Sequence, residues 1–393
     1  MGVLYPRSDL YEFEELLTDA ELAKLRSLRV VLDEQVKPVL AEHWERAESP
    51  VFLLEPLRDL RLVDDPAILG EDGRPSELYL GFRNFEFSRT DLGVGMMFHG
   101  QVGMFRALVL EGGSAEQIAA WDPLIVSFGM TGAFALTEPD HGSDVAGGLS
   151  TTARREGDHW VLNGFKRWIG NAAHSEYVAI LARDVADGQV KAFIARTDAP
   201  GMTLTTIERK ASLRLVTNSD IALDGVVVPE THRLPGIGSF ADVSALMRTL
   251  RPDAAWNAAG VQAGAYEAAL TYTLQREQFG RPVAGFQLVQ DKLVRMLGNV
   301  TASLGLLVRL AQRRQSGIFR DEDSALAKTW IADRMRETVA LAREVVGGNG
   351  IVIDYDVARF FTDAEAVYTF EGTREINTLV VGRAITGLSA FTR

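Results

Sequence analysis

The sequence predicts a multidomain α+β protein with an N-terminal helical domain, a middle β-barrel or β-sandwich domain and a C-terminal helical bundle. Three observations predict it. Apolar residues recur at helical spacing in the first third, short β-rich runs separated by Gly, Asn, Asp and Pro fill the middle, and the helical period then returns almost to the end. We place the domains at residues 1–125, 126–240 and 241–393.

Each domain rests on particular segments. In ELLTDAELAKLRSLRVVLDEQV, five leucines can share one helical face: Leu16, Leu17, Leu22, Leu25 and Leu28. The runs HWVLNG, EYVAILARD, VKAFIART and DIALDGVVVP predict strands of the middle domain. The stretch DSALAKTWIADRMRETVALAREVV predicts a long helix that ends at Gly347, with one buried stripe: Leu326, Trp330, Thr338, Ala342 and Val345.

The composition excludes several classes of protein. The chain has 393 residues, 47% of them hydrophobic and 24% charged, which is typical of a globular enzyme. No membrane span and no signal peptide are recognisable, so we expect a cytoplasmic protein. The absence of cysteine excludes disulfides, thiolate metal sites and iron–sulfur clusters, and no other metal site is predicted. Redox chemistry would therefore need a bound cofactor.

The segment AVYTFEGTREINTLVVGRAITG, residues 366–387, places Glu371 in an apolar setting. Tyr368 and Phe370 precede it, and Gly372 allows the backbone to approach a ligand closely. Partial desolvation would raise the pKa and the basicity of the carboxylate, which makes Glu371 a candidate catalytic base. The alternative is a carboxylate that caps a helix beginning near Thr373, because helix N-termini attract acidic side chains.

Two segments of the middle domain are candidates for binding a cofactor. The chain has no GxGxxG, so a dinucleotide would not be held by a Rossmann turn. FALTEPDHGSD offers the hydroxyls of Thr137 and Ser143, and Gly142 allows amide groups to point at a pyrophosphate; the alternative is a surface turn. NGFKRWIGN contains Trp168, which could lie against an isoalloxazine ring; the alternative is a core tryptophan.

The C-terminal domain carries further candidates. In QREQFGRPVAGFQ, Arg276 could pair with a pyrophosphate while Phe279 and Gln287 contact an adenine or ribose, unless Arg276 only caps the preceding helix. Gly348 of GGNG admits a cofactor phosphate or simply follows the end of a helix. Arg251, in TLRPD, is a candidate anion contact in a cleft; the alternative is a solvated arginine beside a helix kink.

FALTEPDHGSD, KRWIGN, REQFG, GGNG and TFEGT occur together and in this order, and this set resembles the acyl-CoA dehydrogenase superfamily over nearly the whole chain. KASLRLVTNSDIALDGVVVPETHRLPG and VGRAITGLSAF are similar to the glutaryl-CoA dehydrogenase branch, and WIGN with SFADVSALM is similar to the plant short-chain acyl-CoA oxidases of that branch. The resemblance implies a four-helix bundle, FAD, an acyl-CoA substrate and electron-transfer flavoprotein as the electron acceptor. It also implies a homotetramer in which a neighbouring subunit completes each FAD site.

By motif position, the resemblance implies roles for particular residues. Within one subunit, the FAD contacts would be Leu136, Thr137, Gly142, Ser143, Trp168, Thr373 and Glu375. Across the subunit boundary they would be Arg276, Phe279, Gln287 and Gly348. Ser143, Arg251 and Gly372 would contact the substrate. Glu371 would take the α proton of a short- or medium-chain acyl-CoA while the β hydrogen leaves as hydride to flavin N5, which gives a trans-2-enoyl-CoA.

Two positions depart from the pattern. Glutaryl-CoA dehydrogenases carry an arginine where DLGVGMMFHG has Gly95, and without that charge a buried dicarboxylate tail would be unpaired. We therefore expect no glutaryl-CoA decarboxylation and an apolar acyl pocket lined by Met96, Met97 and Phe98, unless His99 binds an acidic tail.

The second departure is Gly170, where many dehydrogenases have a Thr or Ser that hydrogen-bonds flavin N5. Its loss leaves an acyl-CoA oxidase, which passes electrons to O2, as an alternative to the dehydrogenase. A different class is a catalytically silent or nucleic-acid-binding flavoprotein on this fold. Residues 241–393 contain 18 Lys plus Arg against 17 Asp plus Glu, and the whole chain has a net charge of -12, so we expect no nucleic-acid partner.

Overall fold

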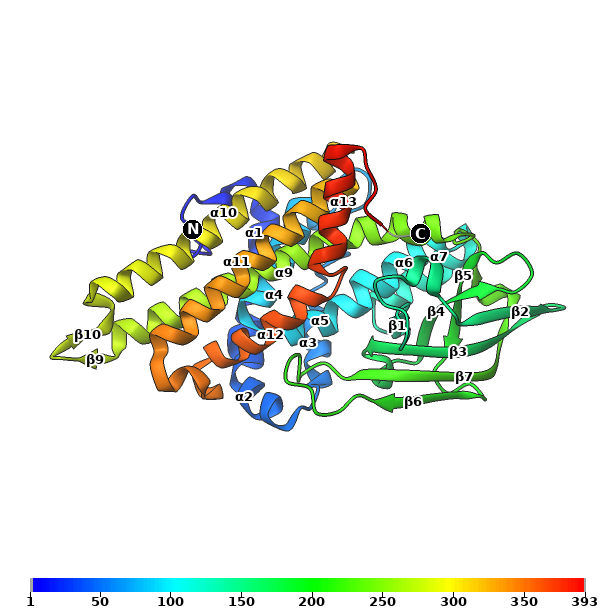
Figure 1. The fold of residues 1–393 in the computed structure, drawn as a ribbon, viewed down its shortest axis with the longest axis horizontal. Coiled ribbons are helices and arrows are strands. Elements are labelled where there is room, and N and C mark those ends of the chain that lie inside the picture. Colours follow the sequence, from blue (N-terminus) through cyan, green and yellow to red (C-terminus); the bar gives the residue numbers. More distant parts are fainter. Residues whose placement is uncertain (1–2, 392–393) are drawn as a thin grey trace.

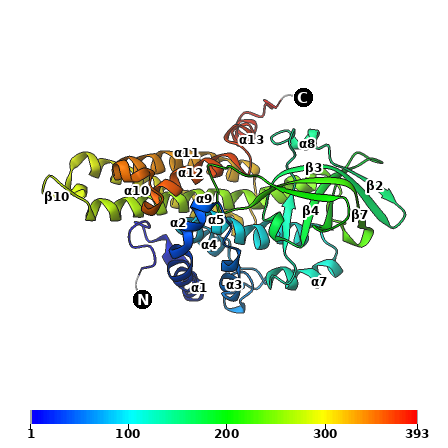
Figure 2. The same ribbon diagram turned by 90° about the horizontal axis from the view of Figure 1, so that it is seen from below.

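The long helices of the C-terminal third lie side by side at one end of the molecule, and the β-sheet forms the other end (Figure 1). The N-terminal helices cover one side of the long helices (Figure 2). This computed structural model describes residues 3–391. Its order of helical, sheet and helical regions confirms the predicted fold class.

The N-terminal region is helical and begins and ends its helices at recognisable caps. Thr18 and Ser114 each form a capping box: the cap side chain accepts a hydrogen bond from the amide of the third helical residue, and the cap backbone amide donates one to the side chain of that residue. A π-helical stretch, Gly100–Phe105, joins two of the helices. The helices are α1 (Asp19–Val31), α2 (Lys37–Arg46), α3 (Leu54–Asp59), α4 (Glu77–Thr90), α5 (Leu92–His99), α6 (Arg106–Gly112) and α7 (Ala115–Val126).

The middle region forms one eight-stranded mixed sheet in the order β6-β7-β3-β2-β4-β5-β8, with β1 parallel to β4. A register shift between Lys166 and Ile169 interrupts the pairing of β3 with β7. The short helix α8 (Val145–Gly148) follows the first strand. The strands are β1 (Gly132–Ala135), β2 (Thr152–Glu156), β3 (His159–Gly170), β4 (Tyr177–Asp184), β5 (Val190–Arg196), β6 (Met202–Thr206), β7 (Asn218–Pro229) and β8 (Arg233–Leu234).

The C-terminal region is built around α9, which is 36 residues long. A small hairpin joins α9 to α10 at the end of the molecule far from the sheet (Figure 1). The elements are α9 (Phe240–Gln275), β9 (Glu277–Gln278), β10 (Arg281–Pro282), α10 (Gln287–Gln315), α11 (Asp321–Val346), α12 (Val357–Thr369) and α13 (Arg374–Thr386).

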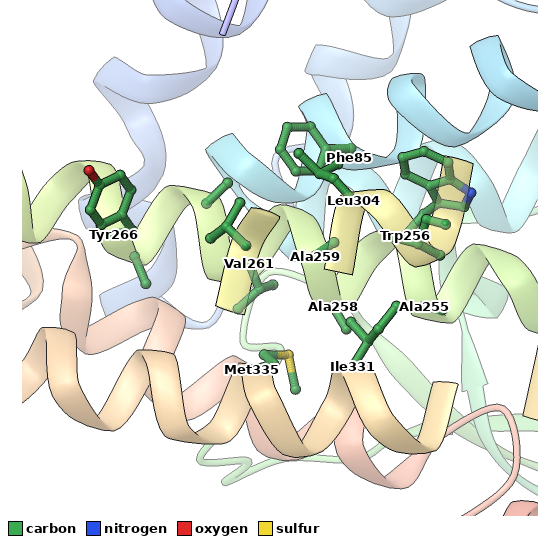
Figure 3. Packing of buried hydrophobic residues seen from close by; sticks show 14 of the residues in the cluster. Phe85, Ala255, Trp256, Ala258, Ala259, Val261, Tyr266, Leu304, Ile331 and Met335 are labelled. Carbon is green, nitrogen blue, oxygen red and sulfur yellow. The ribbon is translucent and has the colours of Figure 1, made fainter. Parts of the chain in front are cut away.

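The largest core surrounds the middle of α9, where small residues allow neighbouring helices to approach closely (Figure 3). A Cβ on Gly260 would lie 2.5 Å from the Phe85 carbonyl oxygen, and one on Gly264 would lie 2.3 Å from the Arg89 carbonyl oxygen. Both carbonyls belong to α4, so glycine is required where α4 crosses α9.

The predicted stripe on α11 is partly wrong. Thr338 and Ala342 are buried, but Leu326 and Trp330 are 50% and 38% exposed. The face that packs inward at this end of α11 is one of small residues, Ala325 and Ala327, together with the buried Lys328 and Ile331. The helix does end as predicted, because Gly347 has a φ of 67° after Val346.

Among the described residues, α10 is the one helix whose length and composition would allow it to cross a membrane. Half of its most apolar stretch is buried inside the fold. Within the same residues, no group of three or more His, Asp or Glu side chains is placed to hold a metal ion.

Candidate active site

Glu371 lies in the tight turn between α12 and α13. Its φ is 57° and that of Gly372 is 85°, so two consecutive residues adopt left-handed backbone conformations. Such a φ is uncommon and costly for a residue with a side chain. Thr373 ends the turn, because its hydroxyl accepts a hydrogen bond from the Ile376 amide at the start of α13. The carboxylate atom Oε2 of Glu371 is buried and has no hydrogen-bond partner among residues 3–391.

Two buried side chains hold this turn by donating hydrogen bonds to its carbonyl oxygens. Lys328 Nζ, on α11, donates to the carbonyl oxygens of Tyr368 and Gly372, both at 2.8 Å. Asn377 Nδ2 donates to the carbonyl oxygens of Gly372 at 2.8 Å and Thr373 at 3.2 Å. The carbonyls on both sides of Glu371 are therefore fixed, and this accounts for how the unusual backbone persists.

The surroundings of Glu371 bring the pKa of its carboxyl group close to neutral pH. Burial and, to a smaller extent, the negative charge of Asp253 raise the pKa of Glu371, the positive charges of Arg251 and Lys328 oppose them, and the resulting pKa is about 7. Burial lowers the pKa of Lys328 to about 8, against the effect of Glu371 and Glu375. A carboxyl group with a pKa near neutral can accept a proton in a reaction at physiological pH.

Arg251, the predicted anion contact, is largely buried and not a solvated arginine, since its side chain is 15% exposed. Its Nε and Nη1 atoms are buried without hydrogen-bond partners in the described chain. The nearest acidic oxygen, Oδ1 of Asp321, is 3.9 Å from Nη1. Burial lowers the pKa of Arg251, and Asp321 and Glu371 oppose this. Arg251 therefore offers unused donors close to the carboxylate.

The loop after β1 is anchored through Glu138. Its carboxylate accepts from the Ser150 and Thr151 amides and from Lys166 Nζ at 2.9 Å. Burial alone would raise the pKa of Glu138, but Lys166 and these hydrogen bonds outweigh it and lower the pKa to about 2. The hydroxyls of Thr137 and Ser143 have no partners in the structure described here, and a Cβ on Gly142 would meet no atom within 4 Å. The loop is thus held in place through Glu138, and it has free space at Gly142. Leu136 is buried at its start.

Trp168 lies where β3 departs from β7. Its φ is 65° and its side chain is 51% exposed, so the ring projects out of the sheet and does not join the core. Its carbonyl accepts from Asn218 Nδ2 at 3.3 Å. The adjacent Gly170 has room for a side chain, because a Cβ would be 3.6 Å from the nearest atom, on Val216. The large exposed ring offers a flat apolar surface for a ligand.

The other predicted cofactor contacts lie at the opposite end of the molecule. Phe279, at the tip of the β9–β10 hairpin, is 94% exposed, and Arg276, Gln287 and Gly348 are also exposed. Asn349 Nδ2 donates to the Tyr272 hydroxyl at 3.0 Å, which ties the GGNG turn to the same end of α9. The hairpin and the sheet lie at opposite ends in Figure 1. One chain therefore does not bring Trp168 and Phe279 to the same ligand.

The three predicted pocket residues on α5 point in different directions. Met96 contacts α9, where its Sδ atom is 3.7 Å from Asn257 Nδ2. Met97 lines a small cavity beside the β-sheet, and Phe98 stacks on Phe87 in the N-terminal core. Met96 therefore contacts the helix that carries Arg251.

Gly95 is confined by the same core. A Cβ there would lie 3.0 Å from the Cβ of Phe87, so a larger residue would require α4 or α5 to move. The position therefore has no room for an arginine side chain without rearrangement.

Sequence reasoning missed Lys328, Asn377 and Asp253. Lys328 could have been found, because a lysine next to Ala327 and three residues before Ile331 lies on the apolar face of a helix, where a charged side chain is unusual. Asn377 is close in sequence to its partners, the carbonyl oxygens of Gly372 and Thr373, but an Asn in the first turn of a helix does not by itself indicate this role. Asp253 could not be found from local sequence, because its partners lie on separate helices.

The acyl-CoA dehydrogenase middle-domain model matches residues 133–226, and the C-terminal domain model matches residues 240–386. The chain is 30% identical over 392 residues to the probable acyl-CoA dehydrogenase fadE25 of Mycobacterium bovis, and the match covers 97% of this chain and 98% of that protein.

Two solved structures of glutaryl-CoA dehydrogenases from Mycobacterium smegmatis are similar over the whole fold. One matches with a TM-score of 0.91 and 35% identity, over 98% of this chain and 99% of that one. The other, a complex with FADH2, matches with a TM-score of 0.92 and 29% identity, over 99% and 100%. The chain therefore belongs to the acyl-CoA dehydrogenase family of FAD-dependent oxidoreductases and resembles its glutaryl-CoA dehydrogenase branch.

Proposed function

We propose that this enzyme converts a short- or medium-chain acyl-CoA to the trans-2-enoyl-CoA, with Glu371 as the base that removes the α proton. The observation that carries the proposal is the buried, unpartnered Oε2 atom of Glu371 in a turn held by Lys328 and Asn377. A carboxylate that only capped α13 would accept from the first amides of that helix, but Thr373 fills this role. The arrangement leaves Glu371 available to a substrate.

The thioester carbonyl needs a hydrogen-bond donor as its α proton leaves. The Glu371 backbone amide donates no hydrogen bond within the described chain, so it is available for this role. Bound FAD supplies the acceptor for the β hydrogen. Arg251 supports the carboxylate form of Glu371, since its charge lowers the pKa of that group. Gly372 leaves the backbone beside the base uncovered.

The residues present fit FAD. In one subunit, Trp168 would lie against the isoalloxazine ring, while Thr137, Gly142 and Ser143 would hold phosphate oxygens. Leu136, Thr373 and Glu375 would complete this half, and Ser143 would also reach the CoA thioester.

Arg276, Phe279, Gln287 and Gly348 would hold the other half of an FAD bound mainly to a neighbouring copy. Their distance from the sheet within one chain supports this division (Figure 1). We therefore propose a homotetramer, located in the cytoplasm, with electron-transfer flavoprotein as the electron acceptor.

An acyl-CoA oxidase is the second candidate, and Gly170 favours it. A side chain would fit at this position, yet no hydroxyl is present to hydrogen-bond the flavin. Glutaryl-CoA decarboxylation is less well supported, because Gly95 is packed against Phe87 where that branch carries an arginine.

Anaerobic titration with butyryl-, octanoyl- and glutaryl-CoA, followed by admission of air, tests these alternatives. We expect the visible flavin absorbance to bleach with a monocarboxylic thioester and to return slowly in air. Rapid return with peroxide would establish the oxidase, and carbon dioxide release from glutaryl-CoA at a rate comparable with butyryl-CoA turnover would contradict the argument from Gly95. The absence of bleaching with every thioester would refute the proposed function.

The rate of proton abstraction should depend on pH. Glu371 must be a carboxylate to act as a base, and its pKa is raised to about 7, so the reductive half-reaction should slow as the pH falls through about 7. An unburied glutamate would lose activity only near its ordinary value of 4.5. Stopped-flow bleaching across this range measures the acidic limb of the pH–rate profile. A rate that stays constant down to pH 4.5 would show that the base is not Glu371.

A further inference from the structure

Four polar side chains from three helices meet around Asp253, which stands two positions after Arg251 on α9. Asn84 Nδ2, on α4, donates to Asp253 Oδ1 at 2.9 Å, and Arg83 Nη2 donates to Asn84 Oδ1 at 3.0 Å. His99 Nε2, on α5, lies 3.6 Å from Asp253 Oδ2. Asp253 is close enough to Glu371 to raise its pKa. We call Arg83, Asn84, His99 and Asp253 the polar cluster.

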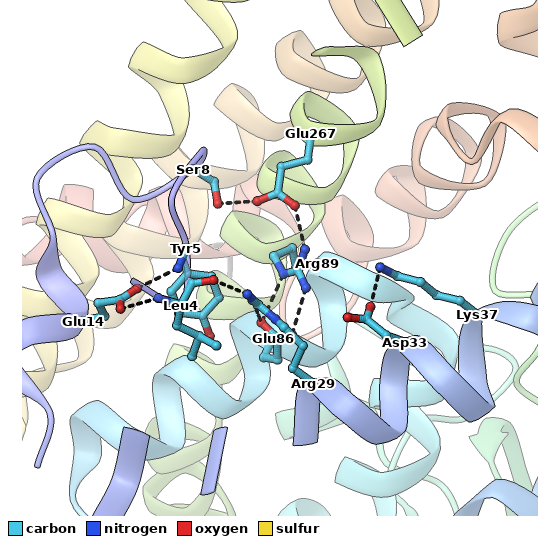
Figure 4. Close-up of polar contacts among 10 residues, drawn as sticks. All are labelled: Leu4, Tyr5, Ser8, Glu14, Arg29, Asp33, Lys37, Glu86, Arg89 and Glu267. Atoms are coloured by element: carbon cyan, nitrogen blue, oxygen red, sulfur yellow. Dashed lines mark hydrogen bonds and ion pairs between the residues drawn. The ribbon is translucent and has the colours of Figure 1, made fainter. Parts of the chain in front are cut away.

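The polar cluster holds no backbone group, whereas several other buried polar side chains do. Elsewhere such groups secure the fold: Glu14 accepts from the Leu4 and Tyr5 amides, and Arg29 donates to the Leu4 carbonyl (Figure 4). Lys166 and Lys328 likewise donate to carbonyl oxygens. Within residues 3–391, the hydrogen bonds of the polar cluster run only between its own side chains.

Its charges are also incompletely paired. On α4, Arg89 binds the carboxylates of Glu86 and Glu267 (Figure 4). Arg83, six residues earlier, is buried and makes no ion pair in the described chain. Its guanidinium group has five donor hydrogens, and its only acceptor among those residues is Asn84 Oδ1. Asp253, by contrast, is accessible, since its side chain is 24% exposed. Buried groups of this kind are costly unless a ligand completes their hydrogen bonds.

We propose that the polar cluster binds a hydroxyl group carried by the acyl chain of the substrate, which rests on the function proposed above. A hydroxyl both donates and accepts, so it can donate to Asp253 and accept from Arg83. A plain alkyl chain would displace water from Asp253 without replacing its hydrogen bonds. A second carboxylate would be repelled by Asp253 and Glu371.

The test compares matched thioesters on the FAD-loaded enzyme. Butyryl-, hexanoyl- and octanoyl-CoA are each compared with the CoA thioester that carries a terminal hydroxyl on the same chain. We expect the hydroxylated member to have a kcat/KM about tenfold or more above its plain counterpart at one chain length, where the hydroxyl reaches Asp253. In Asp253→Leu the ratio should fall to about one, and Arg83→Met should lower it independently.

The ratio within one variant cancels any effect on the base or on FAD binding, so it reports recognition alone. Gln262→Leu is the matched control, since Gln262 is a buried amide further along α9 that binds Ser303 and the Ile331 carbonyl, and it should keep the wild-type ratio. Turnover of plain thioesters with no preference for hydroxylated ones at any length would overturn this inference and leave the proposed function intact. A preference that survives both Asp253→Leu and Arg83→Met would also overturn it.

Discussion

Replacing Glu371 with Gln should lower the rate of acyl-CoA dehydrogenation by about a thousandfold or more, as expected when a general base is removed. FAD should stay bound. Gln has almost the same shape as Glu but accepts no proton at neutral pH. The turn should keep its conformation, because Lys328 and Asn377 bind its backbone and not the Glu371 side chain. Stopped-flow bleaching by butyryl-CoA measures the loss, and the visible spectrum of the purified variant measures bound FAD.

The thermal stability of Glu371→Gln shows whether the variant has lost catalysis alone or has misfolded. Folding raises the pKa of Glu371 from 4.5 to about 7, so the fold favours the protonated form, and stability is lost as the pH rises through this range. The amide of the Glu371→Gln variant would carry no charge, and this variant should therefore be at least as resistant to heat as the wild type at alkaline pH. The control is Glu365→Gln, an exposed neighbour on α12 that pairs with Arg336 and should retain full turnover. Substantial activity in Glu371→Gln would place the base elsewhere.

Local patterns in the sequence predicted the fold class, and tertiary contacts decided the rest. Helical and strand periodicities depend on residues near one another in the chain, so the helical, sheet and helical order could be predicted. The inward face of α11 could not. Leu326 and Trp330 fit an apolar stripe, but the fold buries Ala325 and Ala327 instead, and Ala327 packs in the core that surrounds α9. An exposed apolar residue and a buried one obey the same pattern.

In the candidate site, too, some residues could be predicted from local sequence and others could not. Glu371 was predictable because Phe370, Gly372 and Thr373 surround it in the sequence, and the structure places its carboxylate oxygen in a buried setting. Lys328 lies 43 positions earlier and reaches the turn only because α11 packs against α12 and α13. Asp253 was likewise passed over, although it stands two positions after Arg251, since its partners belong to α4 and α5.

Replacing Lys328 with Met should change both the rate and its pH dependence. The carbonyl oxygens of Tyr368 and Gly372 would lose their buried donor, at about 1–3 kcal/mol of stability for each, and Glu371 would lose a positive charge that lowers its pKa. We therefore expect kcat for butyryl-CoA to fall by about a hundredfold, because proton transfer depends on the position of the base, and the acidic limb of the rate to move to higher pH. Stopped-flow bleaching across pH measures both quantities.

Lys210→Met distinguishes a positioning role from a general loss of stability. Lys210 is also largely buried, burial lowers its pKa to about 8, and its Nζ atom donates to the carbonyls of Leu213 and Val216 in a loop of the middle region. Its loss should cost a similar amount of stability in a thermal melt but leave the pH limb where it is, because Lys210 is not among the charges that act on Glu371. If Lys328→Met behaved like Lys210→Met, with a lower melting temperature and an unmoved limb, Lys328 would stabilise the fold without positioning or tuning the base.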